Sequence, residues 1–111
     1  MMPIVSEQMV QDAFDWLQSH ADSAAAAKAE KIRAEYNVKA TRAKIFLLNE
    51  GTVAERQATA DCAPTTKEAY DREAEAVEKD EWHHRHRSKC EAIIEAWRTE
   101  QANLRGMGKV G

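Results

Sequence analysis

The sequence predicts an all-α protein, built as a long helical hairpin with an N-terminal helical arm and assembling as an oligomer. Apolar residues recur at helical spacing along most of the chain. Only four Gly and two Pro interrupt the 111 residues, so long helices are favoured over strands and turns. Large apolar residues are few while Ala is abundant, which makes a thick core within one chain hard to build. Thin, Ala-rich helices usually complete their cores by pairing with other helices, and we therefore expect several copies to associate.

The first 22 residues have the pattern of a short helical arm. Ser6 is placed to cap a helix, and four apolar residues then recur at helical spacing: Met9, Val10, Phe14 and Leu17. The polar residues 19–23 indicate a turn, with Asp22 or Ser23 capping the next helix. One uninterrupted helix is the alternative, because residues 24–27 are all Ala. We expect the arm to dock on the rest of the domain or on a neighbouring subunit.

Residues 28–52 read as one long helix that ends in a turn. Six residues fall within one sector of about 80° on a helical wheel: Ala29, Ile32, Tyr36, Ala40, Ala43 and Leu47. Basic residues line both flanks of this sector: Lys28, Lys31, Lys39 and Arg42 on one side, Arg33 and Lys44 on the other. Such a seam can bury its middle against another helix and offer its edges to a polyanion. The simpler interpretation is that Lys and Arg stems only cover the rim of an apolar seam.

Local signals predict two further helices. Gly51 can adopt the left-handed conformation that ends a helix, and Thr52 with Glu55 forms a capping-box pattern. A short helix is therefore expected from Val53 to about Ala63, where Pro64 ends it. Thr65 or Thr66 is then expected to cap the last helix, which runs to Arg105. Residues 23–105 form the predicted hairpin domain, and the glycine-containing residues 106–111 form a flexible tail.

The last helix carries apolar residues on two nearly opposite faces. One face holds Tyr70, Glu73 and Val77, and the other holds Trp82, His86, Cys90, Ile93, Trp97 and Leu104. A straight helix with two such faces contacts two partners, which we take to be the hairpin mate and a second subunit. Trp82, Ile93 and Trp97 are the residues expected in the core or at the oligomer interface.

Charge is distributed unevenly along a chain whose net charge is only -3. Residues 28–44 contain six basic and two acidic side chains, a net charge of +4. Residues 67–81 contain three basic and seven acidic side chains, a net charge of -4. The basic segment can bind a polyanion, or the two segments can pair with each other.

The sequence contains no recognisable catalytic or cofactor motif. Serines lack a nucleophile elbow, no Gly-rich phosphate loop is present, and neither an enzyme nor a cofactor is expected. The cluster His83, His84 and His86 has the spacing of metal ligands, but Arg85, Arg87 and Lys89 oppose a bound cation, and a solvated basic turn is the main interpretation. Cys62 and Cys90 are expected to be reduced thiols. With no membrane-spanning run and no leader, the chain is expected to be soluble and cytosolic.

A sequence pattern around residue 43 resembles a known family. The basic-Ala-basic triplet Arg42-Ala43-Lys44 precedes the apolar run 45–48 and Gly51, and an acidic stretch and a long terminal helix follow. This pattern resembles the UvsY-type recombination mediators, within the small helical proteins of tailed phages and prophages. The resemblance implies that Arg42 and Lys44 contact single-stranded DNA, in a ring of subunits that helps load a recombinase onto strands covered by single-strand-binding protein. The resemblance also implies that the protein is located in the cytoplasm of a bacterial host cell. This chain departs from the pattern in the order of Arg and Lys within the triplet, the extra helix over residues 53–63 and the His cluster.

Two functional hypotheses follow from the residues and the resemblance. In the first, the chain is an oligomeric recombination mediator that binds single-stranded DNA through basic residues, with a recombinase and single-strand-binding protein as further partners. The expected DNA contacts are Lys28, Lys31, Lys39, Arg42, Lys44 and Arg87. In the alternative, it is a non-enzymatic helical assembly or adaptor protein of a phage or prophage that binds proteins through its apolar seams. Neither hypothesis includes a membrane.

Overall fold

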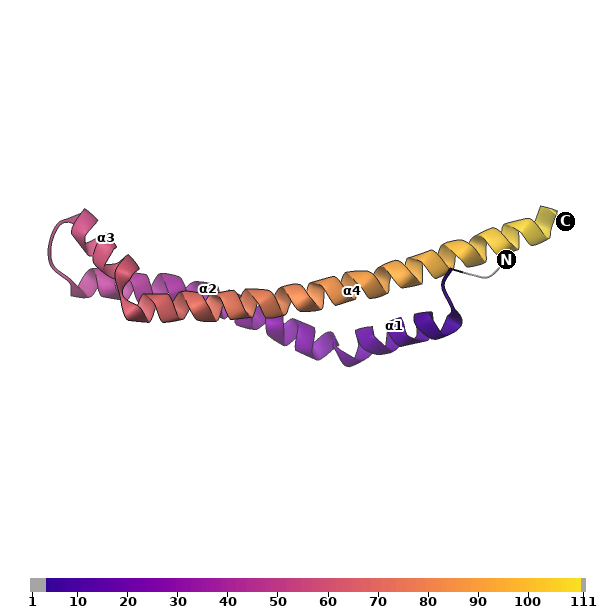
Figure 1. The fold of residues 1–111 in the computed structure, drawn as a ribbon, viewed down its shortest axis with the longest axis horizontal. Coiled ribbons are helices and arrows are strands. Elements are labelled where there is room, and N and C mark those ends of the chain that lie inside the picture. The colour runs from indigo at the N-terminus through magenta and orange to yellow at the C-terminus, as the bar shows by residue number, and fades with distance from the viewer. Residues whose placement is uncertain (1–3, 111) are drawn as a thin grey trace. The chain divides into compact units, whose positions relative to one another are not determined.

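The protein is all-α, as the sequence predicts. A computed structural model describes residues 4–110 and the side chains of residues 4–108. This range contains four α-helices and no strand: α1 (Glu7–Ser19), α2 (Ala21–Leu48), α3 (Val53–Cys62) and α4 (Pro64–Val110) (Figure 1). The assembly of the chain into an oligomer stays a prediction.

The junction between α1 and α2 is a single residue. At the start of α1 the Ser6 hydroxyl accepts a hydrogen bond from the amide of Met9 (3.1 Å), as predicted for an N-cap. The helix ends at His20, whose amide donates to the carbonyl of Trp16 (3.0 Å), and α2 begins at once. The structure therefore lies between the two alternatives, a turn over residues 19–23 and an uninterrupted helix. Asp22 lies in the first turn of α2 and does not precede it as a cap.

The turn between α2 and α3 forms as its sequence predicts. Gly51 has φ of +120°, a backbone conformation that side-chain-bearing residues rarely adopt. Thr52 is the N-cap of α3, and its hydroxyl accepts a hydrogen bond from the amide of Glu55 (3.1 Å). On the other side, the side-chain amide of Asn49 donates to the carbonyl of Ile45 (2.7 Å) and satisfies a carbonyl at the end of α2.

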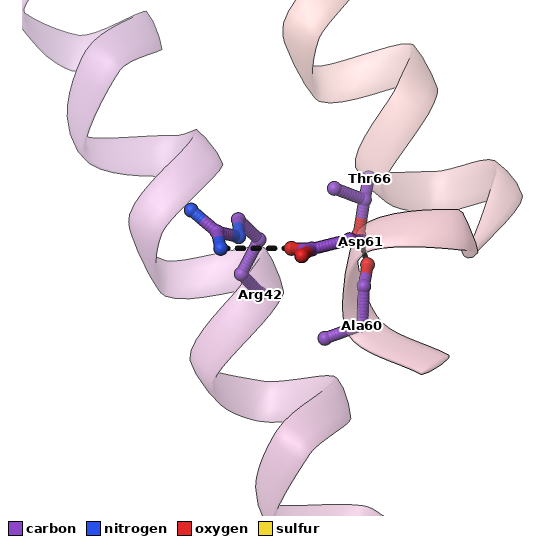
Figure 2. Close-up of polar contacts among 4 residues, drawn as sticks. All are labelled: Arg42, Ala60, Asp61 and Thr66. Carbon is purple, nitrogen blue, oxygen red and sulfur yellow. Dashed lines mark hydrogen bonds and ion pairs between the residues drawn. The ribbon is translucent and has the colours of Figure 1, made fainter. Parts of the chain in front are cut away.

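The corner between α3 and α4 differs from the prediction. Ala63 is extended (φ -66°, ψ 139°) and Pro64 is the first residue of α4. Amides in the first turn of a helix have no intrahelical partner, so the missing amide hydrogen of Pro64 costs α4 no hydrogen bond. The predicted capping role of Thr65 or Thr66 is therefore wrong, because both lie inside the first turn. Thr66 is instead fully buried, and its hydroxyl donates to the carbonyl of Ala60 at 2.6 Å (Figure 2).

The last helix is longer than predicted. It continues past Arg105 through Gly106 and Gly108 to Val110, so the helix end predicted at residue 105 is wrong. Two glycines cost roughly 1 kcal/mol each in a helix, and the 40 and more residues that precede them supply a template on which extension needs no new nucleus. Of the predicted tail, only Gly111 lies outside the described residues.

The chain folds as two compact units. The terminal unit, as we call it, combines the chain up to Ser23 with the chain from Trp82 onward, and the central unit is Ala24–Glu81. In the terminal unit Ala13 of α1 is buried with Cys90 and Ile94 of α4, and three half-buried residues pack against them: Trp16, Leu17 and Ile93. In the central unit the buried apolar residues are small: Ala27 and Val38 of α2, Ala60 of α3, and Ala69 and Ala76 of α4.

One heptad row accounts for the buried side of α4. Ala69, Ala76, His83 and Cys90 are all buried and follow one another at intervals of seven residues. A heptad row drifts by about 20° per repeat around an α-helix, so its direction changes gradually from one repeat to the next. The two partners of α4 within the chain are α2 in the central unit and α1 in the terminal unit. The face that contains Cys90 and Ile93 packs against α1 of the same chain, and a second subunit as a further partner of α4 stays a prediction.

Candidate interaction surface on α2

Most of the apolar seam predicted from the sequence is exposed in the structure, and of its six residues only Ala29 is half-buried. Inside the central unit α2 buries Ala27 and Val38, with Ala34, Thr41 and Ile45 half-buried in the same row. The six seam residues, which we call the outer stripe, lie roughly opposite this row at 100° per residue: Ala29, Ile32, Tyr36, Ala40, Ala43 and Leu47. The exposed fractions are 57% for Ile32 and 73% for Tyr36 and Leu47. The expectation that this seam packs against another helix is therefore not met within the chain.

Small side chains explain which row of α2 is buried. The buried apolar residues of the two long helices in the central unit are small, with Ala27 and Val38 on α2 and Ala69 and Ala76 on α4, and short side chains allow packed helices to approach closely. A bulky residue such as Tyr36 in this row would hold the two helices apart. Ile32, Tyr36 and Leu47 are left on the outward side of α2, where no described residue buries them.

Ion pairs join α2 to the acidic helix, as the charge pattern allows. Lys31 lies 3.6 Å from the carboxylate of Asp80, and Glu30 lies 3.3 Å from the ammonium of Lys79. These groups are partly exposed, so each pair contributes little to stability, on the order of 0–1 kcal/mol. The pairs join α2 and α4 within the central unit. Lys31, one of the predicted DNA contacts, is therefore already paired with an acidic residue.

Arg42 is also paired, through the position of α3. Its guanidinium Nη2 lies 2.7 Å from the Asp61 carboxylate near the end of α3 (Figure 2). A second contact holds α3 on α2: the Arg56 guanidinium lies 4.2 Å from the centroid of the Phe46 ring and donates through Nε to the Phe46 carbonyl (3.0 Å). A shallow cleft of about 270 Å³ separates the two helices: its lining residues are Lys39, Arg42, Ala43, Phe46, Gln57, Ala60 and Asp61. Arg42 Nε is buried there and has no hydrogen-bond partner among the described residues.

Four cations on the outward half of α2 are left without acidic partners. Lys28, Arg33, Lys39 and Lys44 are exposed, and none of them forms an ion pair within the part of the chain that the structure describes. We call them the border cations, because Lys28 and Lys39 follow one edge of the outer stripe and Arg33 and Lys44 follow the other. Arg33 was not among the predicted DNA contacts, although its place on the helical wheel already put it beside Lys44.

The remaining predicted DNA contact, Arg87, lies in the terminal unit. It is exposed and its Nε lies 3.2 Å from the carboxylate of Glu91, one helical turn further along α4. Arg87 therefore belongs to a different unit from the border cations, which all lie in the central unit. Of the six predicted contacts, Lys31, Arg42 and Arg87 are paired with acids, and Lys28, Lys39 and Lys44 belong to the border cations.

The histidine cluster is part of an aromatic contact between α1 and α4. The Trp16 ring stacks on His20 (centroids 4.3 Å apart) and lies 5.5 Å from His86, which in turn lies 4.2 Å from Trp82. His83 is buried in the same unit, with 7% of its surface exposed. The predicted solvated basic turn is therefore wrong for His83 and His86, because α1 covers them. No group of three or more His, Cys, Asp or Glu in the described chain is arranged to hold a metal ion.

The residues predicted for the core or an oligomer interface are partly exposed to solvent. Ile93 packs against the buried cluster of the terminal unit and is half-buried, as is Trp97. Trp82 is 46% exposed and joins the aromatic contact through one side. Cys90 is buried, and this burial raises the pKa of its thiol above the ordinary value of 9.0, whereas Cys62 is exposed.

Comparison of the chain with protein-family models, with curated proteins and with solved structures gives no match. The resemblance to UvsY-type mediators therefore stays a sequence pattern. None of the helices in the described residues combines the length and the apolar character that crossing a bilayer requires.

Proposed function

We propose that this protein is a non-enzymatic single-stranded-DNA-binding protein that acts as a recombination mediator in an oligomer. The observation that carries the proposal is the set of four border cations, which the acidic helix of the same chain leaves unpaired. A chain with a net charge of -3 can bind a polyanion only through a local excess of positive charge. The outward half of α2 has such an excess, because acidic residues of the central unit are paired with Lys31 and Arg42 instead.

The spacing of the border cations suits a flexible single strand. Lys28 and Lys39 are eleven residues apart, as are Arg33 and Lys44, which corresponds to about 16 Å along a helix. Two parallel rows of this kind contact phosphates without reading bases, so binding should be independent of sequence and weaken as salt rises.

The ion pair of Arg42 changes the roles that the resemblance implies. Lys44 is available to a phosphate as it stands. Arg42 must first leave Asp61, which lies 2.7 Å from its guanidinium, and the exchange of one anion for another gains little. Border cations therefore replace Arg42 as the main contacts in the proposal. The recombinase and the single-strand-binding protein enter it as partners only through the resemblance.

The test is a fluorescence-anisotropy titration of a labelled single strand at several salt concentrations. The Lys28→Ala, Lys39→Ala double variant should bind more weakly, and the slope of log K against log salt should fall by about 0.7 per cation removed. The matched control removes two exposed cations of α4 that form no ion pair among the described residues, Lys67→Ala with Arg72→Ala, and should keep most of the affinity. A folded protein that fails to bind at low salt, or equal losses in both double variants, would overturn the proposal.

A second function, that of a helical assembly or adaptor protein, is favoured by a different observation. Three large apolar residues of the outer stripe are more than half exposed, although apolar area of this kind is usually covered by a partner. Replacing Ile32 and Tyr36 by Ser should then abolish association with other proteins and leave the secondary structure intact. If these variants also keep full affinity for single-stranded DNA, the adaptor function is separable from the mediator function.

A further inference from the structure

A second exposed apolar stripe lies in the same unit, on α4. Tyr70 is 45% exposed and Val77 is 38% exposed, and Ala74 lies between them at helical spacing. We call these three residues the α4 stripe. Asp71 and Glu78 follow its outward border, and both are exposed without an ion pair among the described residues. This stripe thus has the same apolar character as the outer stripe of α2 and the opposite charge along its border.

The charges argue against pairing of two outer stripes with each other. A two-fold antiparallel contact between two α2 helices would place each edge of one stripe against the same edge of its copy. Arg33 and Lys44 would then meet their own counterparts, and so would Lys28 and Lys39. Like charges across a helix pair are destabilising, so four border cations on each copy oppose this arrangement.

We propose that the outer stripe of one copy binds the α4 stripe of a second copy of the chain. In an antiparallel arrangement large side chains meet small ones: Tyr36 lies against Ala74, and Tyr70 lies against Ala40. Helical geometry then places Asp71 and Glu78 along the edge that carries Arg33 and Lys44. The register is the one that α2 and α4 already use within the chain, where Lys31 faces Asp80.

The arrangement uses a different face of each copy, so it is heterologous and continues into a ring or a filament. Every copy offers its outer stripe to one neighbour and its α4 stripe to the other. Arg33 and Lys44 then pair with the acidic border of the neighbour, so only one of the two rows of border cations, Lys28 and Lys39 at the opposite edge, is left to contact DNA in the assembly. The repeated pair of lysines would then form a row along the assembly, in which weak single sites add up to tight binding of a long strand. The inference deepens the proposed function by specifying how its oligomer forms.

The test measures molar mass by light scattering over a range of protein concentrations, for two charge-reversal variants. One double variant is Arg33→Glu with Lys44→Glu, and the other is Asp71→Lys with Glu78→Lys. At every concentration each of them should have a molar mass near the single-chain value of 12.5 kDa. An equimolar mixture of the two variants should recover the larger mass, because reversed α2 meets reversed α4. The matched control reverses two exposed acids on another side of α4, Glu68→Lys with Glu75→Lys, and should associate as the wild type does.

Three results would overturn the inference. The first is a wild type that does not exceed the single-chain mass at any concentration, and the second is a reversal of Asp71 and Glu78 that leaves the mass unchanged. The third is a mixture that fails to associate although both variants keep the helical content of the wild type. The DNA titration of the Lys28 and Lys39 variant involves neither reversed pair. A failure of DNA binding is therefore distinguishable from a failure of this interface.

Discussion

Replacing Thr66 by Val tests the reasoning about the corner between α3 and α4. The carbonyl of Ala60 lies in the last turn of α3 and has no amide donor within that helix, because α3 ends at Cys62 and Pro64 has no amide hydrogen. The hydroxyl of Thr66 supplies the missing donor at 2.6 Å, and the residue is fully buried (Figure 2). Val keeps the shape of Thr and removes only this donor. A buried carbonyl without a partner costs about 1–3 kcal/mol, and we expect the free energy of unfolding to fall by that amount.

The assay is urea denaturation followed by far-ultraviolet circular dichroism, with two accompanying variants. Thr65→Val changes the exposed neighbour in the same way and should alter the free energy of unfolding by less than about 0.5 kcal/mol. Thr66→Ser keeps the hydroxyl and should lose less than Thr66→Val does. A Thr66→Val protein as stable as Thr65→Val would refute the argument, since the Ala60 carbonyl would then need no donor from residue 66.

Three further predictions concern charge, burial and backbone conformation. Asp61→Asn removes the carboxylate that holds Arg42, so affinity for single-stranded DNA should rise at low salt and the salt slope should steepen by about 0.7 in the anisotropy titration. Because burial raises the pKa of the Cys90 thiol, the folded state holds this proton more tightly than the unfolded state does. The stability that results is complete below the unfolded pKa of 9.0 and is lost as pH rises through the folded pKa. Urea titrations around and above pH 9.0 should therefore show a decline in the free energy of unfolding. Cys90→Ala should reduce this decline, and a change at the exposed Cys62 should not. Gly51→Ala should cost about 1–3 kcal/mol in thermal unfolding, because φ is +120° and the new Cβ would lie 2.6 Å from a Glu55 carboxylate oxygen; an unchanged melting temperature would contradict this.

The sequence by itself determined the features that depend on a few neighbouring residues. The Ser6 cap, the Gly51 turn and the Thr52 cap each need only contacts within about four positions, and each forms where it was predicted. The all-α class likewise follows from composition and spacing. Pro64 shows the limit of such signals, because a proline is as compatible with the first turn of a helix as with the end of one.

Only the tertiary structure decided which surfaces are covered. Helical spacing indicates that the outer stripe, with Ile32 and Tyr36, is suited to burial, but it does not say against what. The chain instead buries the row that contains Ala27 and Val38, in a unit where the buried apolar residues of α4 are small as well, which favours close helix packing. Likewise, Arg42 meets Asp61 because the corner after α3 brings together residues that are nineteen positions apart. His83 has charged neighbours in the sequence that are typical of a solvated turn, but it is buried because the end of α1 packs against this part of α4. Contacts between distant segments decide these points, and local sequence carries no record of them.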